Sequence, residues 1–570
     1  QVFGAADKAV NKLQLATEQV QSFKFIEASA TFDEASQTFL AASALIENQH
    51  GFASDLLAFA PIIGDQVQAG KDILAIGNEL SDAAVLLSQG VAVLSDPQHF
   101  LAEQPLSYKL EYLFVRLEEA GPLISSANAQ LSEIDPLSIP AEVRGDIELL
   151  QKTLPVLDDQ LKQVNKLAPV LLSYLGHDTL QRYLVVFQNN TEVRATGGFM
   201  GSLALVDLDR AEIQAIDIPG GGPYDYQGSY YDYVAAPRAL QLINPRWEFQ
   251  DTNWFYDWPT SAQKVASVYE KAGGPSVDGV VALNTNVLEA LLEFIGPVYL
   301  EAYEREFTAQ DFRDTLQTYV EFEYDEDLNQ PKKIIADLAP ILLDEIKDLP
   351  PKEFLALASE LSTLLQQKDV MVYHGQEDIQ SQFSELGWSG EVVETDRDYL
   401  AIVHTNLAGG KTDGVIDDAY DLSTHISEAG SVEHTLTISR QHNGVKGVPL
   451  LGVRNVDYLR VYVPNGAHLV SASGFELPPS TLFEAPEESW QIDPLLADGE
   501  LNYQRDEVSG TETYTEGSKT VFANWVQTDP GQTTTVKLVY TVPREVLISY
   551  HLPERDASWT DWITGDTAQQ

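Results

Sequence analysis

The chain has no cysteine, and it has no apolar run of about 18 residues. The first absence excludes disulfide bonds, thiolate catalysis and cysteine-ligated metals. The second means that no segment reads as a membrane-spanning helix, which needs about 20 apolar residues. The chain starts with Gln1 rather than methionine, which indicates that an N-terminal piece has been removed; a signal peptide or an anchor could have preceded Gln1.

Basic residues are scarce: 35 lysines and arginines stand against 86 aspartates and glutamates, for a net charge of −51 at pH 7. Such a chain repels phosphate backbones and anionic lipid surfaces, so we expect no nucleic-acid partner. It should be highly soluble, repel copies of itself at low salt, and offer carboxylates to Ca²⁺ or Mg²⁺. Those two ions are therefore the candidate cofactors, and none is certain.

No nucleophilic or metal-binding motif is readable. The ten histidines are scattered, and none has the i,i+4 spacing of a helical metal site. The acidic run Glu321–Asp327 lacks the spacing and the glycine of an EF-hand loop, which favours a solvated loop over a cation site. The metal ligands, if there are any, stay unassigned.

Three regions differ in their apolar periodicity, which predicts a multidomain α+β protein. Residues 1–178 repeat apolar side chains every three or four positions, the pattern of an antiparallel helical bundle or stalk. Residues 179–388 alternate strands and helices, with a helical insertion near 306–386, which predicts a three-layer α/β domain on a largely parallel sheet. Residues 389–570 carry short alternating segments, the pattern of an antiparallel β-sandwich.

The most informative stretch is Arg182–Asp217. An apolar run, Tyr183–Phe187, predicts a strand buried on both faces. A polar turn follows it and then the pair Gly197–Gly198, before two further strand candidates. Polar groups beside glycines at the end of a buried strand are where α/β folds place sites. A tight turn with a capping asparagine and a surface ion pair between Glu192 and Arg194 remains the alternative.

These patterns define two sets of candidate site residues. The candidate ligand-binding residues are Asn189, Asn190, Arg194, Thr196, Gly197, Gly198, Asn253 and Trp254. If the protein is an enzyme, Arg194 would bind phosphate, and Glu192 or Asp257 would hold Mg²⁺; no catalytic residue is assigned otherwise. Buried hydrogen bonds that only knit the domain together are an equal alternative. A second inward cation and a carboxylate pair beside Arg194 would favour an enzyme, and a filled or neutral cleft would favour a scaffold.

Several segments resemble the bacterial family known as domain of unknown function 4012. They are FQNNTEVRATGGFMGS (Phe187–Ser202), DTNWFYDWPTSA (Asp251–Ala262), VDGVVALNTNVLEALLEFIGPV (Val277–Val298), LGWSG (Leu386–Gly390), DYLAIVHTNLAGGKTD (Asp398–Asp413) and YLRVYVPNGAHL (Tyr458–Leu469). The resemblance implies an envelope or extracytoplasmic protein, usually tethered by an N-terminal membrane helix.

Residues Tyr183–Val298 are also similar, more weakly, to the LytR-CpsA-Psr phosphotransferases, which move lipid-linked glycopolymers onto the cell wall. That similarity implies their fold, and Arg194 falls near one of their pyrophosphate-binding arginines. However, Gly220–Gly221 stand where those enzymes carry Arg-Asp, and Ala195–Gly198 stand where they carry an aspartate. Losing these charges removes much of what phosphoryl transfer needs.

We therefore expect an extracellular protein, secreted or membrane-anchored, with a structural, surface-layer-like or binding role. Its partners would be copies of itself or other envelope proteins and glycans, and it would meet the membrane only through an anchor upstream of residue 1. The alternative is a diverged phosphotransferase that moves a lipid-pyrophosphate-linked glycopolymer to the cell envelope.

Overall fold

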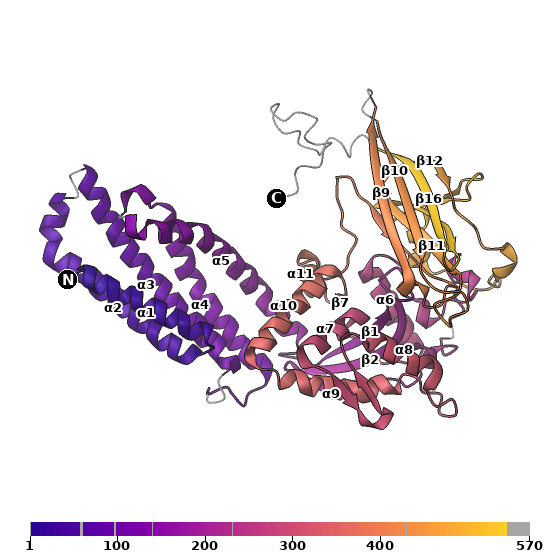
Figure 1. Ribbon diagram of the computed structural model, residues 1–570, viewed down its shortest axis with the longest axis horizontal. Helices are drawn as coiled ribbons and strands as arrows, with labels where there is room; N and C mark the ends of the chain where they lie inside the picture. The colour runs from indigo at the N-terminus through magenta and orange to yellow at the C-terminus, as the bar shows by residue number, and fades with distance from the viewer. Residues whose placement is uncertain are drawn as a thin grey trace.

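The computed structural model describes residues 2–57, 61–95, 99–139, 141–230, 232–427 and 431–543. The molecule is elongated, with helices at one end, a mixed unit in the middle and a strand-rich region at the other end (Figure 1). The expected α+β fold is therefore confirmed at this level. No helix in the described ranges is both long and apolar enough to cross a membrane.

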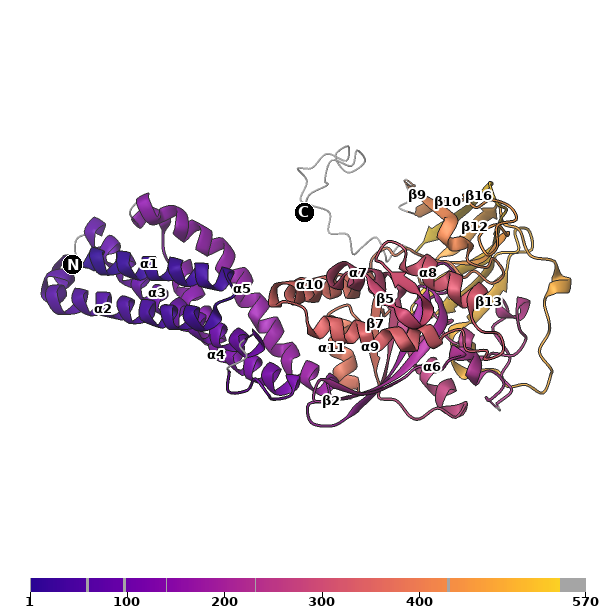
Figure 2. The same ribbon diagram turned by 60° about the horizontal axis from the view of Figure 1, so that its bottom comes forward.

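Five long helices form the N-terminal region. They are α1 (Val2–Gln21), α2 (Phe25–Leu57), α3 (Pro61–Ser95), α4 (Leu106–Ser132) and α5 (Ala141–Tyr174). Each packs on the next in sequence, and fully buried alanines such as Ala28 and Ala35 lie at their contacts. Figures 1 and 2 show this array extending away from the rest of the molecule. It is attached where Tyr174, at the end of α5, packs against Tyr183 and Phe383.

The central sheet has five strands. Their order is β3 (Glu212–Asp217), β2 (Phe199–Asp209), β1 (Gln181–Asn189), β4 (Gly279–Asn284) and β7 (Val370–His374). Only β1 and β4 pair in parallel, while the other three pairs are antiparallel. The expectation of a largely parallel sheet is therefore wrong, because the short turns β1–β2 and β2–β3 permit only antiparallel pairing.

Helices cover both faces of this sheet. On one face, α6 (Trp258–Lys271) packs over β1 and β4. On the other lie α7 (Thr285–Ile295), α10 (Pro351–Gln367) and α11 (Glu377–Glu385). The segment expected as a helical insertion also contains the edge strand β7, which the sequence pattern did not indicate.

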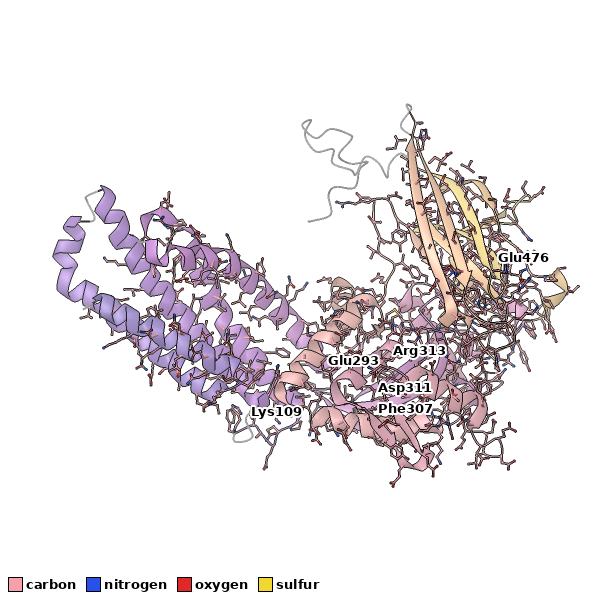
Figure 3. The ribbon with its side chains drawn as sticks, in the orientation of Figure 1. Lys109, Glu293, Phe307, Asp311, Arg313 and Glu476 are labelled. Carbon is pink, nitrogen blue, oxygen red and sulfur yellow. The ribbon has the colours of Figure 1, made fainter. Side chains whose placement is uncertain are left out.

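The first part of that segment, together with the strand just before it, forms a small satellite unit. It comprises the hairpin β5 (Val298–Leu300) and β6 (Arg305–Phe307), with α8 (Phe312–Thr318) and α9 (Lys333–Lys347). Its own core includes Phe307 and Leu338. Figure 3 labels Phe307, Asp311 and Arg313, which lie together in this unit.

Two antiparallel sheets form the C-terminal region. One has the order β12 (His468–Ser473), β16 (Thr533–Val542), β10 (Val432–His442) and β9 (Ile416–Ile426). The other has β13 (Leu501–Arg505), β14 (Glu512–Glu516), β15 (Lys519–Thr528), β11 (Asn455–Pro464) and β8 (Ala401–Val403), and the short α12 (Pro494–Gly499) precedes it. The two sheets share a core between them that includes Ile438, Val461 and Leu538.

The strands β11 and β15 are buried along their whole length. One face of each meets the opposing sheet, and the other face, which carries Tyr458 and Trp525, packs on the central unit. Trp254 stacks on Tyr458 with ring centroids 6.0 Å apart. The buried Arg460 also donates a hydrogen bond to the Trp254 carbonyl at 2.9 Å. The central unit and the strand-rich region therefore share one continuous apolar core.

Candidate functional site

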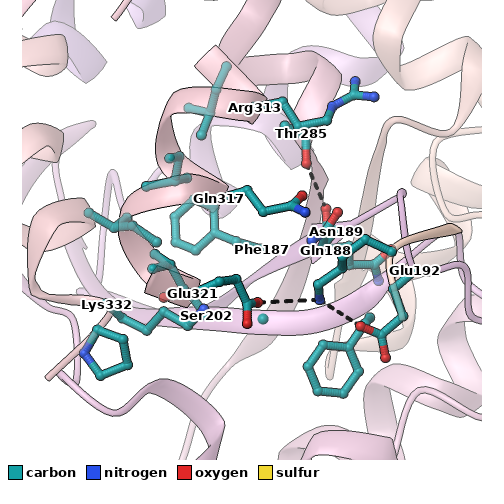
Figure 4. A pocket seen from close by; sticks show the side chains of 18 of the residues that line it. Phe187, Gln188, Asn189, Glu192, Ser202, Thr285, Arg313, Gln317, Glu321 and Lys332 are labelled. Carbon is teal, nitrogen blue, oxygen red and sulfur yellow. Dashed lines mark hydrogen bonds and ion pairs between the residues drawn. The ribbon is translucent and has the colours of Figure 1, made fainter. Parts of the chain in front are cut away.

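A cavity of about 630 Å³ opens where the parallel strands β1 and β4 end (Figure 4). We call it the main cavity. Its apolar wall comes mostly from α7, α8, α9 and the two strand ends, and consists of Phe187, Leu283, Leu288, Phe312, Leu316, Val320 and Ile335. Its charged lining includes Glu192, Glu321, Lys332 and Lys411. The carboxyl end of adjacent parallel strands is a usual position for a ligand in α/β folds.

Lys332 is the least compensated charge of the main cavity. In the part of the chain that the structure describes, no carboxylate lies within ion-pairing distance of its ammonium group. Burial, together with the nearby charge of Lys411, lowers the pKa of Lys332 to about 8. Helix α9 begins at the next residue, so the partial positive charge of a helix N-terminus adds to the same region.

A chain of ion pairs links Lys411 to Arg194. The Lys411 ammonium lies 2.6 Å from Glu192 Oε2 and 3.9 Å from Glu321 Oε1, as the dashed lines in Figure 4 mark. Arg194 Nη2 lies 3.0 Å from Glu192 Oε1. Burial disfavours the charge of Glu192, but Arg194 and Lys411 outweigh it, so the pKa of Glu192 lies below its ordinary value. Glu192 thus neutralises two cations at once.

A second, polar cavity of about 460 Å³ adjoins the first. Glu192, Phe199, Tyr224 and Gly410 line both. In the second cavity Arg194 Nη2 lies 3.7 Å from Asp251 Oδ1. Burial raises the pKa of Asp251 to about 6, and the charge of Glu192 adds to the rise while Arg194 opposes it.

Three of the expected residues line these cavities. Asn189 lines the main cavity, Arg194 lines the second, and Glu192 lines both. Asn190 lies beside them and donates a hydrogen bond from Nδ2 to Asn286 Oδ1 at 2.9 Å. Only part of the set proposed from the sequence therefore faces a cavity.

Thr196 and Asn253 serve the packing of the turn. Gln188 Nε2 and Asn253 Nδ2 both donate to Thr196 Oγ1, at 2.9 and 2.8 Å, and Asn253 Nδ2 also donates to the Gly198 carbonyl. These groups are buried, so they hold the turn against β1 and the segment before α6.

The pair Gly197–Gly198 also serves packing. Gly197 has φ +113°, and a Cβ there would lie 2.9 Å from Asn284 Nδ2. A Cβ on Gly198 would lie 2.6 Å from the carbonyl carbon of Asn189. The glycines let the turn lie directly against the ends of β1 and β4 rather than leave room for a ligand.

Trp254 and Asp257 lie outside both cavities. Trp254 belongs to the contact with the strand-rich region described above. Asp257 caps α6 by accepting from the Thr260 N–H at 3.0 Å, and it also accepts from the Val392 N–H at 2.9 Å. Its carboxylate is therefore occupied by backbone donors of two segments.

Sequence reasoning did not assign Asp251, Glu321, Lys332 or Lys411 to the site. Lys411 follows the Asn406–Gly410 loop, more than 200 residues after Glu192, and only the fold brings the two together. Two carboxylates, Glu192 and Asp251, line the second cavity with Arg194, whereas the second cation, Lys411, lines the main cavity. Across the described residues, no cluster of three or more His, Asp or Glu side chains is arranged to hold a metal ion.

The fold and the site thus define an α+β protein with a ligand-sized cavity at the ends of two parallel strands. Residues 178–320 match the model of a family described as Protein of unknown function (DUF4012), which bears out the expected resemblance over those residues. The matched residues include β1–β4 and Arg194, whereas Lys332 and Lys411 lie beyond them. No curated protein matches the chain.

Proposed function

We propose that the main cavity binds an amphiphile, with its apolar chain against the α7–α9 wall and its acidic head group at Lys332. The observation that carries the proposal is an ammonium group with no carboxylate partner among the described residues, in a cavity that also has an apolar wall. An isolated charge is costly to desolvate unless a partner compensates it. An anionic ligand group would provide that compensation.

The size and lining of the cavity support an apolar chain. Pockets for small molecules usually enclose about 300–1,000 Å³ and are mostly apolar, with a few polar groups that fix orientation. The main cavity, at about 630 Å³, falls in this range. An eight-carbon chain would remove the surfaces of Leu288, Leu316 and Val320 from water, at about 0.8 kcal/mol per buried CH₂.

The surroundings of Lys332 support an acidic head group. The N-termini of α7 and α9 both lie at the cavity, which Thr285 and Lys332 line. Helix N-termini favour anions because their first N–H groups have no partner within the helix. Lys411 adds a further cation, although Glu192 neutralises most of its charge.

Octyl phosphate and octanol test this proposal by calorimetric titration. We expect octyl phosphate to bind at least about 10-fold more tightly than octanol, since an ion pair in a partly desolvated site contributes more than a surface pair. Lys332→Met should remove this preference. Lys333→Met, which changes the adjacent exposed lysine, should preserve it. Equal affinity for the two ligands, or no binding of either, would overturn the proposal.

A transferase activity is the second candidate, and the state of Asp251 favours it. Burial raises its pKa to about 6, so a fraction of it holds a proton just below neutral pH, next to Arg194 in the second cavity. Such a carboxyl could protonate a leaving phosphate oxygen. The test is release of phosphate from a prenyl pyrophosphate in the presence of Mg²⁺. Release by the wild type that is lost in Asp251→Asn would favour a LytR-CpsA-Psr-like activity over the binding role. No release above the protein-free rate would reject it.

The broader role that we propose is that of an extracytoplasmic envelope protein that associates with copies of itself. Its support is the charge of −51, which opposes self-association until divalent cations screen it. Light scattering should show assembly on adding Ca²⁺ but not on adding the same ionic strength of NaCl. A monomer that does not respond to Ca²⁺ would contradict this part of the proposal.

A further inference from the structure

Two lysines line the main cavity, and they differ in their partners. Lys411 lies 2.6 Å from a Glu192 oxygen and forms an ion pair with it. Lys332 has no such contact among the described residues. The side chain of Lys332 is half-buried, its stem passes the backbone of Gly222, and its backbone N–H donates to the Gly220 carbonyl at 2.9 Å. One cavity thus holds a paired amine and an unpaired amine.

The charges that face Lys332 come from three segments. They are Lys411 from the loop before β9, Glu321 from the segment after α8, and Glu192 from the turn after β1. Lys411 opposes a proton on Lys332, while the two carboxylates favour it, and both carboxylates are closer partners of Lys411. A lysine that is desolvated beside another cation is the arrangement that activates an amine as a nucleophile.

From this geometry we infer that Lys332 is a reactive amine that forms an imine with an aldehyde or ketone group of a ligand in the main cavity. The inference rests on the ligand-binding role proposed for this cavity and specifies a second ligand class for it. The nitrogen lone pair of the neutral amine attacks the carbonyl carbon, both protons of the amine pass to the carbonyl oxygen, and water leaves as the C=N bond forms. No oxidant or reductant is consumed, so the reaction is reversible.

Lys411 has a supporting role in this step. Its amine has a carboxylate partner in the cavity, Glu192, and the amine of Lys332 has none among the described residues. The ammonium charge of Lys411 opposes the protonated form of Lys332, and it stabilises negative charge that develops on the carbonyl oxygen. The apolar wall excludes bulk water, which favours the imine over hydrolysis.

Reductive trapping tests the inference on the full chain. The protein is incubated with octanal and cyanoborohydride near pH 7.5, and the octylated peptide is located by mass spectrometry. We expect Lys332 to be modified at least about 10-fold faster than Lys333 or Lys411, with a rate that rises to half its maximum near pH 8. Lys332→Arg should abolish the fast modification, whereas Lys333→Arg should leave it unchanged.

Octyl phosphate separates this inference from the proposed function. It should protect Lys332 from octanal, because both ligands occupy one cavity. Fast labelling without protection would reject the acidic ligand and retain the reactive lysine. Binding of octyl phosphate with labelling spread evenly over exposed lysines would reject the reactive lysine and retain the acidic ligand. A correctly folded Lys332→Arg protein that still labels rapidly at another lysine would also overturn the inference.

Discussion

Replacing Lys332 by methionine should stabilise the protein while removing its ligand. The pKa of Lys332 falls from 10.5 to about 8, and each pKa unit corresponds to about 1.4 kcal/mol of preference between the protonation states. The upper limit is therefore about 3 kcal/mol of lost stability. Because the side chain is only half-buried, solvent screening reduces the expected gain in the variant to about 1–2 kcal/mol at pH 7.

The size of the effect depends on pH. At pH 7 the lysine is protonated in the unfolded chain, and the folded protein bears the cost of that charge. Between about pH 8 and pH 10.5 the folded state holds fewer protons than the unfolded state, so the stability of the wild type rises with pH. The advantage of Lys332→Met should therefore be full at pH 7 and should shrink at pH 10.

Urea unfolding followed by tryptophan fluorescence measures this difference. All eight tryptophans follow residue 246, so the signal reports on the central unit and the regions after it, and not on α1–α5. Lys333→Met serves as the control at both pH values. The reasoning is refuted if Lys332→Met lowers the free energy of unfolding at pH 7, or if its effect equals that at pH 10.

Three further results are expected. Asp251→Asn should be more stable than the wild type by up to about 3 kcal/mol at pH 8 and no more stable at pH 3.5, because the buried wild-type carboxyl ionises above a pKa of about 6. Urea titrations at the two pH values check this. A difference that does not change with pH contradicts it. Gly197→Ala should lower the melting temperature and cost about 1–3 kcal/mol, because of its positive φ and the contact with Asn284; an unchanged melting temperature would show that the turn can relax. A fragment of residues 176–543 should unfold cooperatively, whereas one of residues 176–388 should bind a hydrophobic dye because it exposes the part of the shared core that the strand-rich region covers. A folded, dye-free short fragment would mean that its core is self-sufficient.

Local patterns predicted the elements well but not their pairing. The apolar run Tyr183–Phe187 is β1, and the helices before residue 178 are present, because periodicity reports which faces of an element are buried. The parallel sheet was inferred from alternation of strands and helices, yet β7 returns antiparallel to β4. Strand direction depends on where a chain crosses the sheet, and composition does not record that.

The strand-rich region shows a second limit. Its segments looked half-buried, one face to a core and one to solvent, which predicts a self-contained sandwich. In β11 the outward face carries Tyr458 and Tyr462, and these rings pack on the central unit. An aromatic side chain suits either an exposed strand face or a buried one. The pattern alone could not decide between them.

The site shows the same division between local and distant information. Arg194 and Glu192 stand two residues apart, so the sequence could couple them. Lys411 joins them from another region of the chain, and Lys332 comes from the start of α9. When the charged residues of a cavity come from distant segments, they form no regular spacing in the sequence from which the cavity could be predicted.

The shared core explains how such a composite cavity keeps its shape. Thr405, directly before the loop that carries Lys411, accepts the N–H of Tyr458 through its carbonyl and donates its own N–H to Asp457. The loop itself is tied back to the turn after β1, since the Asn406 N–H donates to the Val193 carbonyl and the Asp413 carboxylate accepts the Val193 N–H. Because both ends of the loop are fixed, Lys411 approaches Glu192 only when the strand-rich region is docked. Loss of that docking would leave Arg194 as the only ion-pair partner of Glu192. It would also remove Lys411, whose charge adds to burial in lowering the pKa of Lys332.

Trp254→Ala, which removes the ring stacked on Tyr458, should therefore slow the octanal modification of Lys332 although Trp254 lines neither cavity. An unchanged labelling rate in a folded Trp254→Ala protein would show that the loop holds its position without the docked sheet.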